Sequence, residues 1–405
     1  MNRQPVHTFY EGAHLFRVNA AKELGAAALA ALDEHAPTAD AFARAIGVAP
    51  SAAFEEIHGR VLGKLREDPI EDYRLDFEDG YGARADDEED ACATAAARGV
   101  SAAYAAGALP PFHGIRIKPL ERRSAARALR TLEVFLSTLV AEGRGRLPPG
   151  FVVTLPKLTS PEQPAALADA LETHEQRLGL PAGSLRFEIM VETPQSIFGP
   201  DGRVALPDLV RAGRGRCVAA HFGTYDYTAG LGISAAFQHM GHPACDFAKA
   251  AMQCSLAGTG VLLSDGGTNV LPVGSTADVH RAWRLHYADV RRSLEGGFYQ
   301  GWDLHPAQLP TRFAAVFGFF LEGKRAVVER LRAALDKGTA AGSSEAGAGV
   351  LDDPATGQAL LSFFLRGRSC GAFRETDAAQ AGLSPEDLSA DSFAEILARR
   401  SAARS

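Results

Sequence analysis

The sequence LRFEIMVET, residues 185–193, alternates apolar and polar side chains in the way that is typical of a β-strand. Its odd-numbered positions place Phe, Ile and Val on one face, while Glu188 and Glu192 share the opposite face with a methionine. A parallel strand covered by helices needs an apolar outer face. An inner face that ends in a carboxylate is typical of a barrel, because ligands collect at the carboxyl ends of barrel strands.

Seven more segments continue this pattern on both sides of the first. The clear runs are 73–79, 114–120, 151–158, 217–225, 260–265 and 298–305, and a weaker run is 6–11. Longer Ala-rich helical stretches lie between them, and such alternation favours parallel strands. A doubly wound open sheet is the rival, but neither GxGxxG nor a GxxxxGK[ST] phosphate loop occurs. The sequence therefore predicts an α/β fold, a (β/α)₈ TIM barrel.

The domain organisation follows from the same runs. We expect the barrel to occupy residues 1–310, with a helical insertion at about 13–70 after the first strand. A helical C-terminal extension is expected over 311–405, and it begins with one long helix over 311–336. The composition of 337–349 (KGTAAGSSEAGAG) predicts a flexible linker.

Charged side chains gather toward the carboxyl ends of the predicted strands. The group consists of Asp76 and Glu78, Arg116 and Lys118, Lys157, Glu192, and Asp226 just past its strand end. Several carboxylates in one mouth repel each other unless a cation neutralises them. A divalent cation would do this better than side chains alone, and hard oxygen ligands suit Mg²⁺ or Mn²⁺. The alternative is a structural ion-pair network inside the barrel.

Glu188 is expected to belong to such a structural network. It precedes Glu192 by four residues on one strand, which separates the two by roughly 13 Å at about 3.3 Å per residue. We therefore expect Glu188 near the barrel floor, paired with a buried cation.

The composition limits the partners. The 405 residues include 42 Lys and Arg and 49 Asp and Glu, for a net charge of −7. This balance argues against nucleic acid and anionic membrane as partners, and no apolar stretch reaches the roughly 18 residues of a membrane span. The N-terminus lacks an apolar signal core, and the five Cys form no CxxC pair. We expect free thiols and a cytoplasmic location.

Six motifs occur together in a recognisable order. They are LDFEDGYG at 75–82, IRIKP at 115–119, LPKLTSPEQ at 155–163, MVETPQSIF at 190–198, FGTYDYTAGLG at 222–232 and GWDLHPAQL at 301–309. Over about residues 70–310, the chain thereby resembles the citrate lyase β-subunit type of the HpcH/HpaI aldolase/citrate lyase superfamily, within the phosphoenolpyruvate/pyruvate-type barrels.

The resemblance implies roles for individual residues. Glu192 and Asp226 would ligate Mg²⁺, and Arg116 would bind the substrate oxygen that becomes charged. Glu78 and Asp79 would hold metal-bound waters beside the substrate.

Four further residues are candidates for proton transfer or substrate binding. Asp352, in VLDDPATGQAL, weakly resembles a C-terminal Asp of the family that can reach an active site. Asp265 ends a predicted strand and is a second candidate for proton transfer. Lys118, which replaces an Asn of the family, and Lys157 are candidates for binding substrate.

The resemblance implies a Mg²⁺-dependent carbon–carbon lyase that acts through an enolate on a hydroxyacyl-CoA or a small hydroxy or keto acid. One alternative is malate-synthase-like condensation of an acyl-CoA thioester with glyoxylate. Another is a class II pyruvate aldolase, although its His base is missing from DFEDGYG. An alternative of another class is a non-catalytic, metabolite-binding regulatory subunit. The expected partners are an acid or acyl-CoA substrate and further copies of the chain in a homo-oligomer.

Two other sites fit their patterns less well. His239, His242 and Cys245 have zinc-like spacing, but no fourth ligand follows. A Schiff-base role for Lys157 would need a lowered pKa, and neighbouring carboxylates raise it.

The apolar run 317–321 is expected to pack in an oligomer or domain interface.

Overall fold

The computed structural model describes residues 3–339, 354–390 and 392–402. The chain divides into two compact units, one of Pro5–Phe313 and one of Met1–Gln4 with Ala314–Ser405. The division lies within a single long helix.

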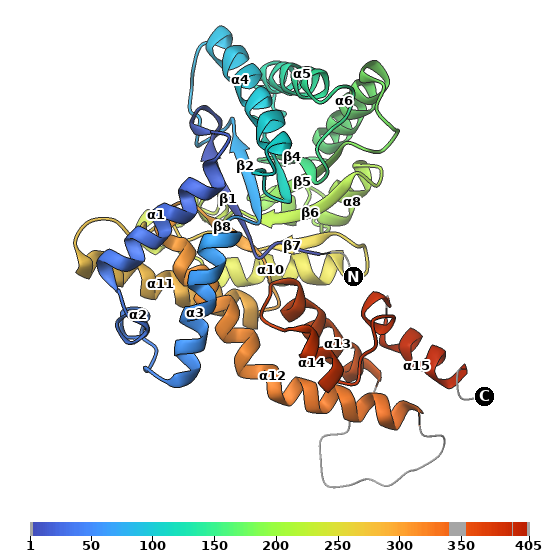
Figure 1. The fold of residues 1–405 in the computed structure, drawn as a ribbon. Coiled ribbons are helices and arrows are strands. Elements are labelled where there is room, and N and C mark those ends of the chain that lie inside the picture. Colours follow the sequence, from blue (N-terminus) through green and yellow to red (C-terminus); the bar gives the residue numbers. More distant parts are fainter. Residues whose placement is uncertain (1–2, 340–353, 391, 403–405) are drawn as a thin grey trace. The chain divides into compact units, whose positions relative to one another are not determined.

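Eight parallel strands form the centre of the first unit (Figure 1). They are β1 (His7–Gly12), β2 (Asp72–Asp76), β3 (Phe112–Arg116), β4 (Phe151–Leu155), β5 (Arg186–Val191), β6 (Cys217–Phe222), β7 (Leu262–Ser264) and β8 (Gly301–Asp303). Their order in the sheet is β7-β6-β5-β4-β3-β2-β1-β8. Each strand thus pairs with its neighbour in the chain, and β1 also pairs with β8.

Backbone hydrogen bonds bring the two ends of this sheet together. The Asp265 N–H donates to the Gln300 carbonyl at 2.8 Å, and the Trp302 N–H donates to the Gly266 carbonyl at 3.1 Å. The sheet therefore forms a nearly closed barrel, and the predicted (β/α)₈ TIM-barrel class is confirmed.

Several of the strands end earlier than the sequence pattern predicts. The predicted run 73–79 leaves the sheet after Asp76, and 114–120 leaves it after Arg116. The alternation continues past these points because the loops still bury the apolar side chains of Phe77 and Ile117. The functional side chains beyond the strand ends are therefore held by loop backbone.

Helices surround the barrel of the first unit (Figure 1). They are α1 (Ala20–His35), α2 (Ala39–Ile46), α3 (Ala52–Glu67), α4 (Asp86–Ala105), α5 (Ala125–Glu142), α6 (Glu162–Leu178), α7 (Pro194–Ile197), α8 (Leu206–Ala212), α9 (Thr224–Gly230), α10 (Pro243–Leu256) and α11 (Thr276–Glu295), with short 3₁₀ turns η1 (Ala13–Leu15), η2 (Ala235–Phe237) and η3 (Pro306–Gln308). The insertion predicted after the first strand thus contains η1 and α1–α3.

Side-chain caps begin several of these helices. The Thr38 hydroxyl accepts a hydrogen bond from the Ala41 N–H at the start of α2, and the Ser51 hydroxyl caps α3 in the same way. Ser275 and Asp278 form a reciprocal capping box at α11. Such caps satisfy N–H groups that the first helical turn leaves without a partner.

The main core lies between the outer face of the sheet and the helices. Leu75, Ile115, Val153 and Phe187 occupy equivalent outward positions on neighbouring strands and are buried. The inner face of the barrel is polar, so its side chains are available for ion pairs and for a site at the mouth.

The second unit is helical. It holds the later part of α12 (Leu309–Thr339), with α13 (Pro354–Ser369), α14 (Glu375–Gln380), η4 (Asp387–Ser389) and α15 (Phe393–Ala402). Phe320 of α12 packs against Phe363 of α13, with ring centres 4.9 Å apart, and Phe364 packs against Phe373 at 5.2 Å. The aromatic side chains of α12 thus contribute to the core of this unit, which the sequence analysis placed in an interface instead.

Two features fall partly or wholly outside the described ranges. Residues 337–339 of the predicted linker are helical, and its remainder is not described. Asp352 also lies outside the described residues. Within the described ranges, no helix combines the length and apolarity that crossing a bilayer requires.

Candidate active site

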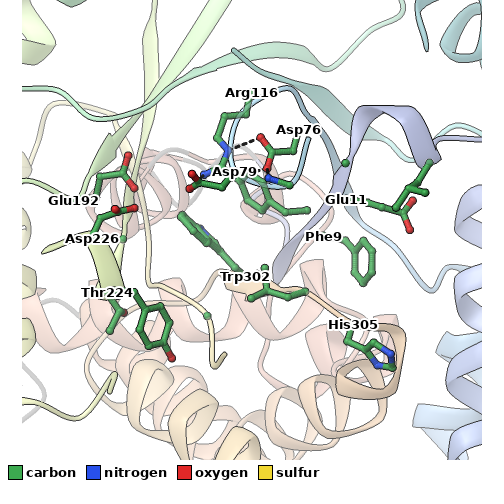
Figure 2. Close-up of a pocket in the computed structure, with 18 of the residues that line it drawn as sticks. Phe9, Glu11, Asp76, Asp79, Arg116, Glu192, Thr224, Asp226, Trp302 and His305 are labelled. Atoms are coloured by element: carbon green, nitrogen blue, oxygen red, sulfur yellow. Dashed lines mark hydrogen bonds and ion pairs between the residues drawn. The ribbon is translucent and has the colours of Figure 1, made fainter. Parts of the chain in front are cut away.

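A cavity of about 540 Å³ opens at the carboxyl ends of the strands. Its lining includes Tyr10, Asp76, Asp79, Arg116, Glu192, Asp226 and Trp302. Figure 2 shows Glu192 and Asp226 as neighbours, with Arg116 and Asp76 on another part of the rim. The structure therefore brings together the two predicted metal ligands and the predicted oxygen-binding arginine.

The Arg116 guanidinium is held in one orientation by acids of the β2 end. Its Nε donates to Asp76 Oδ1 at 2.7 Å, and its Nη1 lies 3.1 Å from Glu78 Oε2. Burial acts to raise the pKa of Asp76, but the charge and hydrogen bonds of Arg116 hold it below its usual value. The Gly80 N–H donates to the same carboxylate, and a Cβ at Gly80 would lie 2.7 Å from Asp76 Oδ2. Glycine at that position allows the loop to close around the acid.

Glu192 follows β5 and is almost fully buried. Its Oε1 accepts a hydrogen bond from the Lys157 backbone N–H at 2.7 Å. Burial raises the pKa of Glu192 to about 8, with Glu78 and Asp226 adding to the effect and Lys157 and Arg116 opposing it. A Cβ at Gly223 would lie 2.4 Å from the Cβ of Glu192, so only glycine permits this close approach after β6.

Lys157 contacts both expected metal ligands. Its backbone has φ = 52°, in the left-handed region that residues other than glycine seldom adopt. This conformation accompanies the N–H contact to Glu192, while the ammonium lies 2.7 Å from Glu78 Oε1 and 3.2 Å from Asp226 Oδ2. Strained backbone of this kind is found at functional sites when the surroundings over-determine it.

The charge state of Lys157 follows from its neighbours. Burial acts to lower the pKa of the Lys157 ammonium, but Glu192, Glu78 and Asp79 raise it well above its ordinary value. A Schiff-base nucleophile needs the opposite shift. The structure therefore disfavours that alternative and assigns Lys157 a lasting positive charge.

Asp226 lies in the first turn of α9, and its side chain is about half exposed. Glu78 is buried, and burial raises its pKa although Arg116 and Lys157 act to lower it. Asp79 is more exposed and lies 3.4 Å from the Lys157 ammonium. These contacts join the five carboxylates of Asp76, Glu78, Asp79, Glu192 and Asp226 to the two cations of Arg116 and Lys157.

This set of oxygen donors suits a magnesium ion that keeps some of its waters, and not an ion whose ligands all come from the protein. Within the described parts of the chain, no three His, Cys, Asp or Glu side chains lie close enough to hold a metal by themselves. Mg²⁺ is commonly bound through one or two carboxylates, with waters and substrate oxygens filling the other positions. Glu192 and Asp226 supply such a pair, in a cluster whose carboxylates outnumber its cations.

Two predicted residues lie away from this cluster. The Lys118 ammonium contacts Glu89 Oε2 at 2.6 Å and the Phe77 carbonyl at 2.8 Å. Asp265 is buried, and its Oδ2 contacts Lys249 at 3.1 Å and the Ser293 hydroxyl at 2.7 Å. Neither residue lines the cavity. Their contacts are those of side chains that tie the barrel to its helices.

The zinc-like segment has a structural arrangement. His242 caps α10 by accepting from the Ala244 N–H, and the Cys245 thiol donates to the His239 carbonyl. Among the described residues, this segment has no group of three His, Cys, Asp or Glu side chains placed to hold a metal ion.

The sequence analysis missed one side of the cavity. Phe9, Tyr10 and Leu15 come from β1 and η1, while Trp302 and Leu304 come from the β8 end. The strand pairing places Phe9 opposite Asp303, so these two distant segments meet only when the barrel closes. Trp302, inside the GWDLHP motif, could have indicated this side of the cavity, because it lies on β8 and lines the cavity.

Glu188 has the place expected for it below the cavity. Its Oε2 accepts from Arg74 Nη2 at 2.9 Å and lies 3.1 Å from His221 Nε2. Arg74 also donates to Asp72 at 2.8 Å and is fully buried. The prediction of a buried cation beside Glu188 is therefore confirmed.

Comparisons with known proteins place the chain in a family and give its fold neighbours. The sequence model of a family described as "Domain of unknown function (DUF6986)" matches residues 1–396, so the chain belongs to that family. No curated protein matches it. A citrate lyase from Burkholderia xenovorans LB400 is 19% identical, with a TM-score of 0.62, and the match covers 94% of this chain and 97% of that one.

Two further solved structures are similar. A Haloferax volcanii malate synthase, solved as a lead(II) complex, is 13% identical with a TM-score of 0.50, over 100% of this chain and 99% of that one. The protein CitE from Mycobacterium tuberculosis, in complex with magnesium and acetate, is 18% identical with a TM-score of 0.44, over 77% of this chain and 90% of that one. The likeness to citrate lyase that the sequence motifs predict is confirmed at the level of the fold.

Proposed function

We propose that this chain is a carbon–carbon lyase that acts through an enolate on an organic acid or its thioester, and that Glu192 and Asp226 hold Mg²⁺ for the reaction. The observation that carries the proposal is the placement of these two acids and the fixed guanidinium of Arg116 around one cavity. The fold shared with a citrate lyase and a malate synthase supports it.

The metal would contribute one part of the chemistry. Bound to Glu192 and Asp226, Mg²⁺ would act as a Lewis acid toward substrate oxygens and orient them. Mn²⁺ suits the same donors. Asp79, which lines the cavity, and Glu78 behind it would accept hydrogen bonds from metal-bound waters.

Arg116 would stabilise the charge that develops on the substrate. In the cleavage direction, a base takes the proton of the substrate hydroxyl and the adjacent carbon–carbon bond breaks. The electron pair of that bond moves onto the carbonyl of the departing acyl part, which becomes an enolate, and a proton then adds to its carbon. Asp76 and Glu78 already orient the guanidinium, so little reorganisation is needed when the enolate oxygen becomes negative.

Lys157 would position the acids of the site. Its backbone N–H fixes Glu192, and its ammonium restrains Asp226 and Glu78. Asp265 is engaged elsewhere. Asp352 therefore stays the candidate for protonating the enolate carbon, on the strength of the family resemblance.

The condensation direction uses the same enolate and is the second candidate. The malate synthase likeness extends over the whole chain, and this favours keeping an acyl-CoA and glyoxylate among the substrates tested. In that direction an acetyl group loses a methyl proton, and the enolate carbon attacks the aldehyde.

Proton NMR in D₂O tests the proposal directly. The protein with Mg²⁺ is mixed with acetyl-CoA or with pyruvate, and the loss of the methyl signal is followed. Exchange of either methyl group is expected, because condensation removes a proton from that carbon and cleavage adds one, and the reverse of the second step also exchanges it with solvent. Acetyl-CoA exchange would favour the citrate-lyase or malate-synthase type, and pyruvate exchange would favour the aldolase type.

The variant Asp226→Asn should slow the exchange about 10³-fold, as removal of a charge-stabilising group does in other enzymes. Asp208→Asn, at an exposed acid of α8, is the matched control and should exchange like the wild type. Absence of exchange together with absence of Mg²⁺ binding would overturn the proposal in favour of a non-catalytic, metabolite-binding role.

A further inference from the structure

The cavity has two unlike sides. Its charged side comes from the ends of β2, β3, β5 and β6, which supply Asp76, Arg116, Glu192 and Asp226. The opposite segments, β1 with η1 and the β8 end, supply mainly carbon. We call Phe9, Tyr10, Leu15, Trp302 and Leu304 the apolar wall. In Figure 2 the Trp302 indole lies between the acidic pair and Phe9.

Two side chains of the apolar wall, Trp302 and Tyr10, carry a polar atom. The Trp302 Nε1 donates to His221 Nδ1 at 3.3 Å, and the Tyr10 hydroxyl is buried without a hydrogen-bond partner among the described residues. The two rings lie 4.8 Å apart, and the Arg116 guanidinium lies 5.1 Å from the Tyr10 ring centre. The wall therefore passes from the guanidinium to an aromatic pair in which the indole N–H is engaged and the phenol hydroxyl is buried.

Two polar side chains on this side already have partners. Glu11 accepts a hydrogen bond from the Tyr73 hydroxyl. The His305 Nδ1 accepts from the Ala307 N–H at 3.2 Å, and burial lowers the pKa of His305, so its ring is neutral at pH 7. Neither arrangement calls for a second charged group on the substrate.

Exposure also marks this side as a binding surface. Leu15 is 42% exposed and Leu304 is 36% exposed, although both line the cavity. Exposed leucines beside a deep charged site gain by contact with an apolar ligand, because burial of carbon surface is favourable. The cavity volume of about 540 Å³ is within the range of roughly 300–1,000 Å³ that holds drug-sized ligands. It exceeds what a three-carbon acid fills.

We propose that the substrate is amphipathic, with an acid-and-carbonyl head toward Arg116, Glu192 and Asp226 and an apolar tail along the apolar wall. This inference rests on the proposed function and adds the chemical class of the non-reacting end. A straight carbon chain or a hydrocarbon ring suits such a wall. A second carboxylate at that end does not, because the wall holds no unpaired cation among its members.

A homologous series measures the tail contact. Pyruvate, 2-oxobutanoate, 2-oxopentanoate and 2-oxohexanoate are titrated into the Mg²⁺-loaded protein by calorimetry, and acetyl-CoA is titrated as a separate arm. Each added methylene is expected to tighten binding roughly fourfold, as burial of one CH₂ does. Dicarboxylates of matched length should bind more weakly than the monocarboxylates.

Three variants locate the effect. Trp302→Ala and Leu15→Gln should reduce the gain per methylene to less than about twofold, and Leu15→Gln changes an exposed side chain, which does not threaten folding. Leu285→Gln, at an exposed leucine of α11 outside the cavity, is the matched control and should keep the wild-type gain.

Each contrary result has a distinct meaning. Equal affinity across the series would overturn the apolar tail and leave the proposed function in place. A rising series that Trp302→Ala and Leu15→Gln leave unchanged would overturn the role of the wall. Binding of acetyl-CoA without binding of any 2-oxo acid would also overturn the role of the wall. The wall would then contact the CoA part of the thioester and not the tail of an acid. No binding of either class would overturn both proposals.

Discussion

The barrel interior contains two charged layers built on the same strands, and they differ in charge balance. The lower layer consists of Asp72, Arg74, Glu188 and His221, and the upper layer consists of Asp76, Glu78, Asp79, Arg116, Lys157, Glu192 and Asp226. Strand β2 supplies residues 72 and 74 to the lower layer and 76 to the upper one, since alternate residues of a strand share a face. Glu188 and Glu192 divide between the layers in the same way.

The lower layer is buried, and its acids are paired with cationic side chains. Arg74 is fully buried and bridges Asp72 and Glu188, while the Thr8 and Thr154 hydroxyls add hydrogen bonds to these acids. Burial acts to raise the pKa of Glu188, but Arg74 and His221 lower it to about 2. Its carboxylate is thus charged and neutralised in place.

The upper layer opens to the cavity and has more acids than cations. Burial raises the pKa of Glu192 to about 8, even though Lys157 and Arg116 oppose that shift. The comparison teaches that residue type does not separate scaffold from site in this barrel. Access to the cavity and the number of acids do, because the upper layer lines the cavity and holds five acids to two cations.

The largest effect is expected from breaking the lower layer. Arg74→Met leaves the Asp72 and Glu188 carboxylates buried without their cation, and loss of one partner of a buried pair costs about 3–5 kcal/mol. Urea unfolding should show this loss. Arg98→Met, which removes an exposed pair with Glu142, should change the unfolding free energy by less than about 1 kcal/mol. Unchanged stability of Arg74→Met would mean that the lower layer is not structural.

The next effect belongs to the upper layer. Arg116→Lys keeps the charge but loses the planar fork that engages Asp76 and Glu78. Methyl exchange should slow about 100-fold, equivalent to about 2.7 kcal/mol, with little change in the melting temperature. The exposed Arg130→Lys is the control. A rate within threefold of wild type would show that the fork is not used.

The smallest effect concerns a neutral histidine near the barrel base. His113 of β3 is buried, and burial lowers its pKa to about 4 although its hydrogen bond to the Pro110 carbonyl opposes this. Between about pH 6.5 and pH 4 the unfolded chain binds a proton here that the folded chain does not, so stability falls as the pH falls.

His113→Asn keeps an N–H donor for the Pro110 carbonyl and removes that titration. The loss of unfolding free energy between pH 7 and pH 4.5 should be smaller in this variant than in the wild type. Urea titrations at the two pH values give the difference for each protein. An equal or larger loss in the variant would contradict the assignment of a neutral buried ring.

Much of the barrel could be predicted because its strands alternate regularly and its charges cluster at one end of each. The residues at which the strands end could not be predicted, since the loops after β2 and β3 continue the alternation of apolar and charged residues outside the sheet. The packing of Phe320 against Phe363 and Phe373 was also out of reach, because these two residues lie more than 40 positions away along the chain.

The charged half of the site could be predicted from single strands. Glu192, Asp226 and Arg116 each follow a recognisable run, and a parallel barrel brings such ends together. The apolar wall depends on the pairing of β1 with β8, a contact between the two ends of the barrel sequence that no local pattern encodes. The sequence analysis did not identify Arg74 as the cation beside Glu188. Its spacing of two residues from Asp76 places it on the inner face of the same strand, which was the available signal.

Calorimetric titration of Mg²⁺ tests most directly the claim that the upper layer receives a cation. The account predicts one Mg²⁺ bound per chain, binding at least tenfold weaker in Asp226→Asn, and wild-type binding in Asp208→Asn. Circular dichroism on the same samples checks that each variant is folded. Absence of binding to the folded wild type, or equal binding by Asp226→Asn, would contradict the account.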